Sequence, residues 1–121
     1  MSFISKIFNK QPKPGRPKEI SDEIFKSIVL DAETPSVVDF YSITCPPCKI
    51  MASLLSEIGP EYVEKVNIYK INVDYFQENA GKYHIAGVPT ILFFKNGKIV
   101  DRVVGLLALN PLREKFDNLS K

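Results

Sequence analysis

The chain has 121 residues, 45% of them hydrophobic and 25% charged, which suits one domain built around a single hydrophobic core. Its apolar runs all fall short of the ~18–20 residues that a bilayer-spanning helix needs. The N-terminal stretch lacks the continuous apolar region and the small-residue cleavage site of a secretory signal. We therefore expect a cytoplasmic protein without a transmembrane segment.

Charge is distributed unevenly along the chain. Residues 1–18 carry five basic side chains and no acidic one, whereas the remainder carries 11 bases and 14 acids. A mildly acidic body argues against nucleic acid as a partner. The apolar side chains of residues 1–10 fall on one face of a short helix, which suits either weak contact with an anionic membrane surface or an extension that is frayed or docked on the domain. We divide the chain into a basic, proline-containing extension, 1–17, and a domain, 18–121.

The domain is predicted to alternate helices with buried strands. A helix starts after the candidate cap Ser21, the segment PSVVDFYS forms a strand, and the helix that follows the cysteines breaks at Gly59-Pro60. A second strand lies in VNIYKINV, and a short helix or irregular segment ends near Gly81. The last elements are a hairpin that turns at Asn96-Gly97 and a helix with Asn110 as its cap and Pro111 as its first residue.

This order of elements limits the fold class. A strand, a helix and a second strand require a parallel pair joined by a right-handed crossover. The later hairpin adds antiparallel strands to the same sheet. We therefore predict an α/β fold with a central mixed sheet of four to five strands and helices on both faces, so that the inner strands are continuously apolar.

Cys45 and Cys48 lie at a predicted strand-to-helix junction, and several kinds of site are open to them. A zinc site within one chain would need four ligands, and His84 is the single histidine. Covalent haem attachment needs a histidine where Lys49 stands. A purely structural disulfide would close too short a loop to stabilise much.

A redox pair suits this spacing best. A cysteine at a helix N-terminus faces free backbone N–H groups, which favour the thiolate that attacks disulfides. Cys48, one turn deeper, can then attack the mixed disulfide. We therefore assign Cys45 as the nucleophile and Cys48 as the resolving cysteine, with no metal and no cofactor beyond their own disulfide.

Several segments, in order, resemble the thioredoxin family. VVDFYSITCPPCK resembles its strand and active site, KINVD its next strand, and GVPTILFFKNGKIVDRVVG its cis-proline loop and terminal hairpin. The resemblance covers Lys18 to the C-terminus and implies the thioredoxin fold. It also implies that Asp39 is a buried acid with a raised pKa, opposed by Lys70 nearby, and that Asp39 accepts the Cys48 proton through water.

The resemblance implies a substrate-binding surface as well. Pro89 matches the cis-proline beside the disulfide, and with Thr90 it would present the Val88 backbone to an extended substrate segment, as in strand addition. The residues assigned to this surface are Thr44, Pro46, Pro47, Gly87, Val88, Pro89, Thr90 and Gly105.

The active-site segment departs from the family pattern at two positions. Thr44 stands where the family has tryptophan, and Pro46 stands where it has glycine. Pro46 and Pro47 both lack an N–H group, so we expect fewer backbone donors to the Cys45 thiolate and a disulfide at least as favoured as in the usual motif. A favoured disulfide suits a protein that acts as a reductant. The altered surface at Thr44 and Pro46 should reduce the range of proteins that it recognises.

The function that we expect is protein-disulfide reduction by a monomer that a thioredoxin reductase or an equivalent donor reduces in turn. Two alternatives stay open. One is a specialised oxidoreductase with a single dedicated partner, and the other is a thioredoxin-fold binding module without turnover. Insulin reduction driven by dithiothreitol separates both enzyme hypotheses from the binding module.

Overall fold

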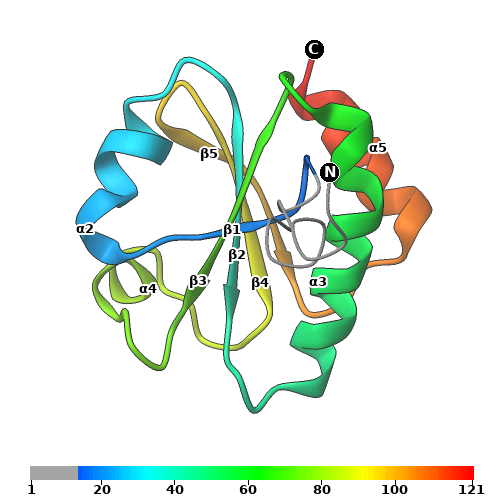
Figure 1. Ribbon diagram of the computed structural model, residues 1–121. Helices are drawn as coiled ribbons and strands as arrows, with labels where there is room; N and C mark the ends of the chain where they lie inside the picture. Colours follow the sequence, from blue (N-terminus) through cyan, green and yellow to red (C-terminus); the bar gives the residue numbers. More distant parts are fainter. Residues whose placement is uncertain (1–13) are drawn as a thin grey trace, which may run out of the picture.

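The computed structural model describes residues 14–121, which build a five-stranded sheet with helices on both faces (Figure 1). The expectations for residues 1–10, and for most of the extension 1–17, fall outside this range. The strands are β1 (Lys18–Glu19), β2 (Ser36–Tyr41), β3 (Asn67–Asn72), β4 (Thr90–Lys95) and β5 (Lys98–Val104). The helices are α2 (Asp22–Phe25, continued by a π-helical stretch, Lys26–Leu30), α3 (Pro46–Ile58, followed by a 3₁₀ turn, Gly59–Tyr62), α4 (Glu78–Lys82) and α5 (Leu109–Leu119).

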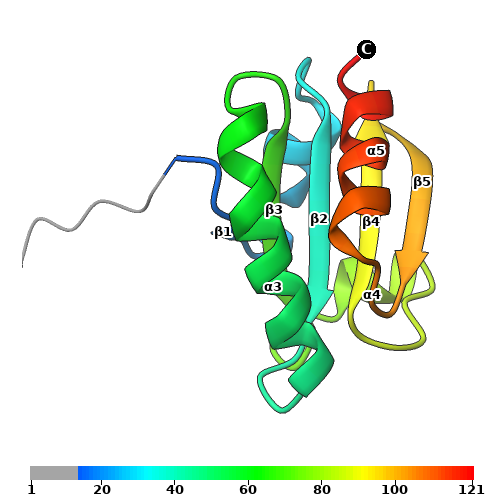
Figure 2. The same cartoon turned by 90° about the vertical axis from the view of Figure 1, so that its right-hand side faces the viewer.

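The sheet has the strand order β1-β3-β2-β4-β5 and is mixed, as predicted. Strands β1 and β2 both pair with β3 in parallel, whereas β4 is antiparallel to β2 and β5. Helices α3 and α5 cover one face of the sheet, and α2 and α4 lie on the opposite face (Figures 1 and 2). Strands β2 and β4, in the middle of the sheet, are therefore covered twice, which explains why five of the six residues in each are buried.

Where the sequence predicted a single hydrophobic core, the sheet divides the core into two, one on each of its faces. The core on the side of α3 and α5 includes Met51, Leu55, Ile91, Phe93 and Phe116. The core on the side of α2 includes Phe25, Val38, Phe40, Leu92 and Phe94. Side chains of consecutive β4 residues point to opposite faces, so this one strand supplies both cores.

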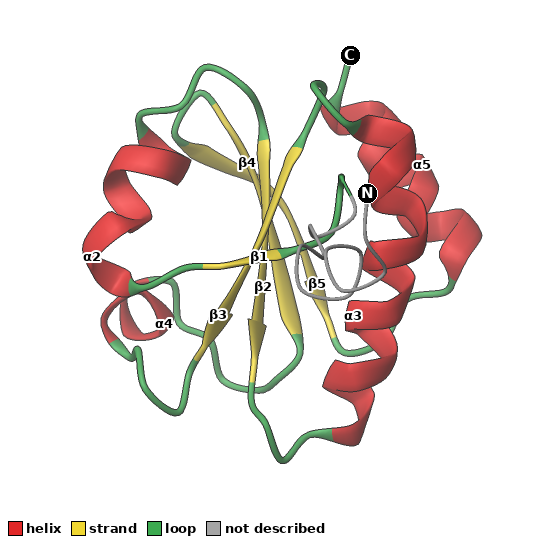
Figure 3. Cartoon of the chain, in the orientation of Figure 1, coloured by secondary structure: helices red, strands yellow, loops and turns green. Residues whose placement is uncertain are grey.

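The terminal hairpin forms as its sequence predicts. Strands β4 and β5 are joined at Asn96 and Gly97, which have φ angles of 53° and 76°. These are the left-handed conformations that a two-residue hairpin turn requires. A register shift between Phe93 and Phe94 follows in the ladder. The hairpin fixes the edge of the sheet that continues into the loop before α5 (Figure 3).

Helix α3 ends at the predicted break. It passes at Gly59 into a 3₁₀ turn, and the carbonyl group of Gly15 lies directly against that residue. A Cβ atom added at Gly59 would stand 1.8 Å from the Gly15 oxygen, so the close approach of the two backbones requires glycine. Residues 14–17 are thereby brought to the C-terminal end of α3.

The structure differs from the sequence-based expectations at both ends of the domain. The two-residue strand β1 was not predicted, because it lies beside prolines and is ordered by pairing with β3. Helix α5 begins at Leu109 with Ala108 as its N-cap, so the assignment of Asn110 as cap and Pro111 as first residue was wrong. The Asn110 side chain instead accepts a hydrogen bond from Arg113 Nη1 at 3.2 Å.

The C-terminus is held at the end of β4. Lys95 Nζ donates to the backbone oxygen of Lys121 at 2.7 Å. Within residues 14–121, no helix is long and apolar enough to cross a membrane.

Asp22 of α2 caps the short helix α4. Its carboxylate accepts hydrogen bonds from the backbone N–H groups of Glu78 and Asn79, both at 3.1 Å, and from Asn79 Nδ2 at 2.8 Å. We expect Asp22→Ala to lower the free energy of unfolding by about 2 kcal/mol, because a cap is lost and the buried Asn79 amide loses an acceptor. Urea denaturation measures this, with the exposed Glu23→Ala as control, and equal stabilities of the two variants would contradict it.

Candidate active site

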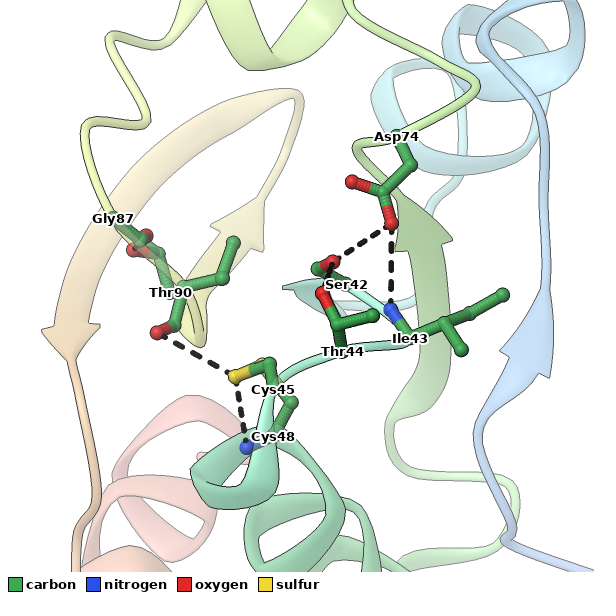
Figure 4. The surroundings of a disulfide bond; sticks show 9 residues. Ser42, Ile43, Thr44, Cys45, Cys48, Asp74, Gly87 and Thr90 are labelled. Atoms are coloured by element: carbon green, nitrogen blue, oxygen red, sulfur yellow. Dashed lines mark hydrogen bonds between the residues drawn. A yellow bond between two sulfur atoms is a disulfide. The ribbon is translucent and has the colours of Figure 1, made fainter.

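The two cysteines form a disulfide at the N-terminus of α3. Cys45 is the N-cap, with an extended backbone (φ −128°, ψ 97°), and its Sγ accepts the Cys48 N–H at 3.2 Å (Figure 4). Pro46 and Pro47 occupy the first two helical positions without N–H groups, so Cys48 supplies the first backbone donor of this helix. Cys45 is 8% exposed and Cys48 2%, an order that fits an attacking and a shielded sulfur.

A loop after α4 lies beside the disulfide. The Val88–Pro89 peptide bond is cis. The Val88 carbonyl oxygen lies 3.8 Å from Cys45 Sγ. Sequence reasoning assigned these residues to substrate binding, and the structure brings the backbone of Val88 to Cys45 Sγ.

Two further contacts fix that loop. Thr90 Oγ1 donates to the Gly87 carbonyl oxygen at 2.6 Å, which closes the turn ahead of β4. The Gly105 N–H donates to the Pro89 carbonyl oxygen at 2.8 Å, so the end of β5 is tied to the same loop. Gly105 has a φ of 81°, a conformation that favours glycine. The predicted residues of this loop and of the β5 end therefore lie together.

Asp39 lies on β2 and is only 1% exposed. Neither carboxylate oxygen has a hydrogen-bond partner within residues 14–121. Burial raises the pKa of Asp39 from 3.8 to about 7, Lys70 opposes that increase, and Glu19 adds to it. The sequence predicted the direction of both the burial effect and the Lys70 effect. A carboxylate with this pKa exchanges protons near neutral pH.

A pocket of about 220 Å³ connects Asp39 with Cys48. Asp39, Cys48 and Lys70 are among the residues that line it. The cavity is large enough for several water molecules, each of which occupies about 30 Å³ in the liquid. Proton transfer through water between the carboxylate and the Cys48 sulfur is therefore geometrically feasible.

Lys70 is partly exposed and has a charged partner, although its neighbours along the strand are mostly apolar. Its side chain is 34% exposed, and Nζ lies 3.8 Å from Glu19 Oε1 on β1. The ammonium group also lies 5.6 Å from the centre of the Tyr41 ring. Lys70 is thus shared between a surface carboxylate and the buried Asp39, an arrangement that sequence reasoning missed because β1 was not predicted.

Asp74 is a second residue that sequence reasoning did not assign to the site. Its Oδ2 accepts hydrogen bonds from Ser42 Oγ at 2.7 Å and from the Ile43 N–H at 3.4 Å (Figure 4). The Ser42 hydroxyl also lies 3.5 Å from Thr44 Oγ1. Asp74 therefore orders the loop that leads into Cys45, and its place at the end of the KINVD segment was the available signal.

The surface around the disulfide combines the remaining predicted residues. Thr44, Pro46, Pro47 and Gly87 are exposed, whereas Pro89 and Thr90 are buried. Among residues 14–121, no group of three or more His, Cys, Asp or Glu side chains is arranged to hold a metal ion. The site brings together the Cys45–Cys48 disulfide and the buried Asp39 carboxyl.

The fold and this site define a class of protein, and comparison with known sequences agrees with it. The profile of the thioredoxin family matches residues 16–118. Thioredoxin C-2 of Corynebacterium nephridii is 46% identical over 97 residues, which cover 80% of this chain and 90% of that protein. The thioredoxin of Buchnera aphidicola is 42% identical over 101 residues, covering 84% and 92%. The chain belongs to the thioredoxin family.

Plant relatives are longer than this chain. The chloroplastic M-type thioredoxin of Pisum sativum is 39% identical over 98 residues, which cover 81% of this chain but 57% of that protein. The match to the M-type protein of Spinacia oleracea likewise covers only 55% of the length of that protein. The chain thus spans a little over half the length of these two relatives.

Proposed function

We propose that the protein is a thiol–disulfide oxidoreductase that reduces protein disulfides by dithiol–disulfide exchange. The single observation that carries this proposal is the Cys45–Cys48 disulfide at a helix N-terminus, with a buried carboxyl of perturbed pKa opening onto the same pocket as Cys48. The relatives named thioredoxin support the same activity.

The first step is attack by Cys45. Its thiolate, favoured by the helix N-terminus, attacks one sulfur of a substrate disulfide. A bond forms between Cys45 Sγ and that sulfur, the substrate S–S bond breaks, and the other substrate sulfur leaves as a thiolate that takes up a proton. The substrate is then held as a mixed disulfide.

The second step is resolution by Cys48. Its thiol gives its proton to Asp39 through the pocket, and the resulting thiolate attacks Cys45 Sγ. The Cys45–Cys48 bond forms, the mixed disulfide breaks, and the second substrate sulfur leaves as a thiolate. Two electrons have passed from the protein dithiol to the substrate, and an external reductase or dithiol must restore the reduced form.

Substrate binding is proposed at the loop beside the disulfide. The Val88 backbone lies next to Cys45 Sγ and would pair with an extended substrate segment, while Gly87, Thr90 and Gly105 hold the loop that presents it. Backbone pairing recognises many sequences, because it does not depend on the side chains of the substrate.

The prolines of the active-site motif tune the reduction potential. Pro47→Ala would return a backbone N–H at the second helical position, from which the N-cap sulfur of Cys45 can accept a hydrogen bond in addition to that of Cys48. One added hydrogen bond to the thiolate, worth about 0.5–1.5 kcal/mol, should raise the potential by roughly 10–30 mV. Equilibration with glutathione buffers, followed by alkylation and mass measurement of the thiols, gives both potentials. A lower reduction potential in the variant would contradict the claim that the missing backbone donors favour the disulfide.

Insulin reduction tests the proposed function. With dithiothreitol as electron source, the wild-type protein should accelerate the precipitation of insulin chains well above the rate with dithiothreitol alone. Cys45→Ser should remove that acceleration, because the nucleophile is lost. A folded wild-type protein that gives no acceleration would refute turnover and favour the binding-module alternative.

A dedicated partner is the second candidate function, and exposed Thr44 favours it. Thr44 stands where the family has a flat tryptophan surface, so the surface around Cys45 would bind a narrower range of proteins. Cys48→Ser should trap substrates on Cys45 as mixed disulfides in a lysate. Many trapped proteins would support a general reductase, whereas one dominant protein would support a dedicated one.

The electron donor and the compartment belong to the same proposal. We propose a thioredoxin reductase or an equivalent dithiol donor as the source of electrons, and the cytoplasm as the compartment. A reducing compartment would keep the cysteine pair in its dithiol form. Coupling to the reductase of the host measures the first part, and fractionation of host cells measures the second.

A further inference from the structure

Three charged residues stand in one row across the sheet. Glu19 on β1 is in register with Lys70 on β3, and Lys70 is in register with Asp39 on β2. Residues in register on neighbouring strands place their side chains on the same face of a sheet. Glu19, Lys70 and Asp39 therefore lie side by side across three neighbouring strands, on the face of the sheet that α3 covers.

The outer acid of this row makes two contacts. Glu19 Oε1 accepts a hydrogen bond from the Tyr41 hydroxyl and lies 3.8 Å from Lys70 Nζ. Tyr41 and Lys70 are also neighbours, since Nζ lies 5.6 Å from the ring centre. Both of these residues line the pocket that connects Asp39 with Cys48. Glu19, which does not itself line the pocket, thus contacts two of the residues that do, Tyr41 and Lys70.

We propose that Glu19 is a positioning residue of the exchange reaction: it fixes Lys70 and Tyr41 at the mouth of the pocket and shares the Lys70 charge, so that Asp39 remains a base able to take the Cys48 proton. This inference rests on the proposed function for its role in turnover. Its effect on Asp39 itself does not depend on turnover.

The electrostatics of the row support this role. Burial is the main cause of the raised Asp39 pKa, Lys70 lowers that pKa, and Glu19 raises it. Burial, followed by the hydrogen bond to Glu19, also raises the pKa of Tyr41, so the phenol stays protonated and continues to donate. The charged and titratable groups that face Asp39 come from four elements: Tyr41 on β2, Lys70 on β3, Glu19 on β1, and Cys48 and Lys49 on α3.

Glu19 matters at the resolving step. Cys48 gives up its proton to Asp39, the Cys45–Cys48 bond forms, and the substrate sulfur leaves Cys45 as a thiolate. If Glu19 were neutral, Lys70 would interact with Asp39 alone and favour its ionised form. Asp39 would then be a weaker base, and the Cys48 proton would be removed less readily.

Carboxyl NMR titration of the oxidised protein tests this inference directly. With ¹³C-labelled aspartate, and Asp39→Asn to assign the signal, the wild-type midpoint should lie near the pKa of about 7. Glu19→Gln should lower it by about half a pH unit, the order expected for one partly screened charge. Glu19→Asp should recover part of the shift. Glu23→Gln, which changes an exposed acid of α2 on the other face of the sheet, should leave the midpoint unchanged.

A second background isolates the positioning effect. In Lys70→Met protein, Glu19→Gln should move the midpoint by less than half as much, because the shared lysine is gone. An unmoved midpoint in Glu19→Gln alone, an equal shift in both backgrounds, or the same shift in Glu23→Gln would overturn the inference. Insulin reduction is measured separately on the same proteins, so a lack of turnover with a normal midpoint shift would refute the proposed function and leave the titration result standing.

Discussion

Replacing Asp39 with asparagine is expected to stabilise the protein, and increasingly so as the pH rises. The folded-state pKa of about 7 lies above the unfolded value of 3.8, so the folded protein holds a proton that the unfolded chain has released. The free energy of unfolding of the wild type therefore decreases as the pH rises from 3.8 to about 7, by about 4 kcal/mol in total. Asparagine, which resembles the protonated acid in shape, does not carry this penalty.

Urea denaturation at several pH values measures this effect. The stability difference between Asp39→Asn and wild type should be small at pH 4, grow through pH 5–7, and level off above pH 7. Asp31→Asn, at an exposed position that pairs with Lys26, should give a nearly flat difference. A difference for Asp39→Asn that does not change with pH would show that the carboxyl ionises normally.

The same variant should turn over more slowly. Without the carboxylate, the Cys48 proton must leave to bulk water, and positioned general bases contribute about 10²–10⁴-fold in rate. We expect insulin reduction to fall at least tenfold and to lose its dependence on a group with a pKa near 7. Equal exchange rates of variant and wild type from pH 6 to 8 would dismiss the proton-acceptor role of Asp39.

A second large effect is expected at Phe116. This α5 residue is 0% exposed and packs its ring edge-on against Phe93 of β4, with 6.0 Å between ring centres. The centre of the Tyr62 ring also lies 5.1 Å from the centre of the Phe116 ring. Phe116→Ala should lower the free energy of unfolding by about 3–5 kcal/mol, because a large cavity opens between the last helix and the sheet.

The cavity argument has an internal control. Tyr75 is an aromatic residue of similar size but is 73% exposed, so Tyr75→Ala should cost less than about 0.5 kcal/mol. Both variants are compared by urea denaturation under the same conditions. Similar losses in the two proteins would mean that α5 does not depend on its core contact.

Sequence patterns predicted the elements whose signals are local. Strand β2 is a β-branched and aromatic run, and the hairpin carries an Asn96-Gly97 turn, so each specifies its own conformation. The break of α3 at Gly59 is encoded in the same way, by a glycine and a proline in succession. The cysteine pair and Asp39 were found because their spacing belongs to one continuous segment.

The features that sequence reasoning missed depend on residues far apart in the chain. β1 is ordered by pairing with β3, some 50 residues away, and only that pairing brings Glu19 to Lys70. Asp74 orders the active-site loop from 31 and 32 residues beyond its two partners there. At α5, a local rule favoured Asn110 as cap, but its side chain bonds Arg113 inside the helix. Tertiary contacts decide such positions.

The contact between Lys95 and Lys121 has a practical consequence for handling the protein. Strand β4 begins at Thr90, beside the disulfide, and ends at Lys95, whose ammonium group binds the last backbone oxygen. Six strand residues at about 3.4 Å each separate the two ends by roughly 17–20 Å. A bead, a fluorophore or a fused polypeptide attached after Lys121 would therefore sit at the pole opposite Cys45, where an immobilised form keeps its reactive face open to large proteins.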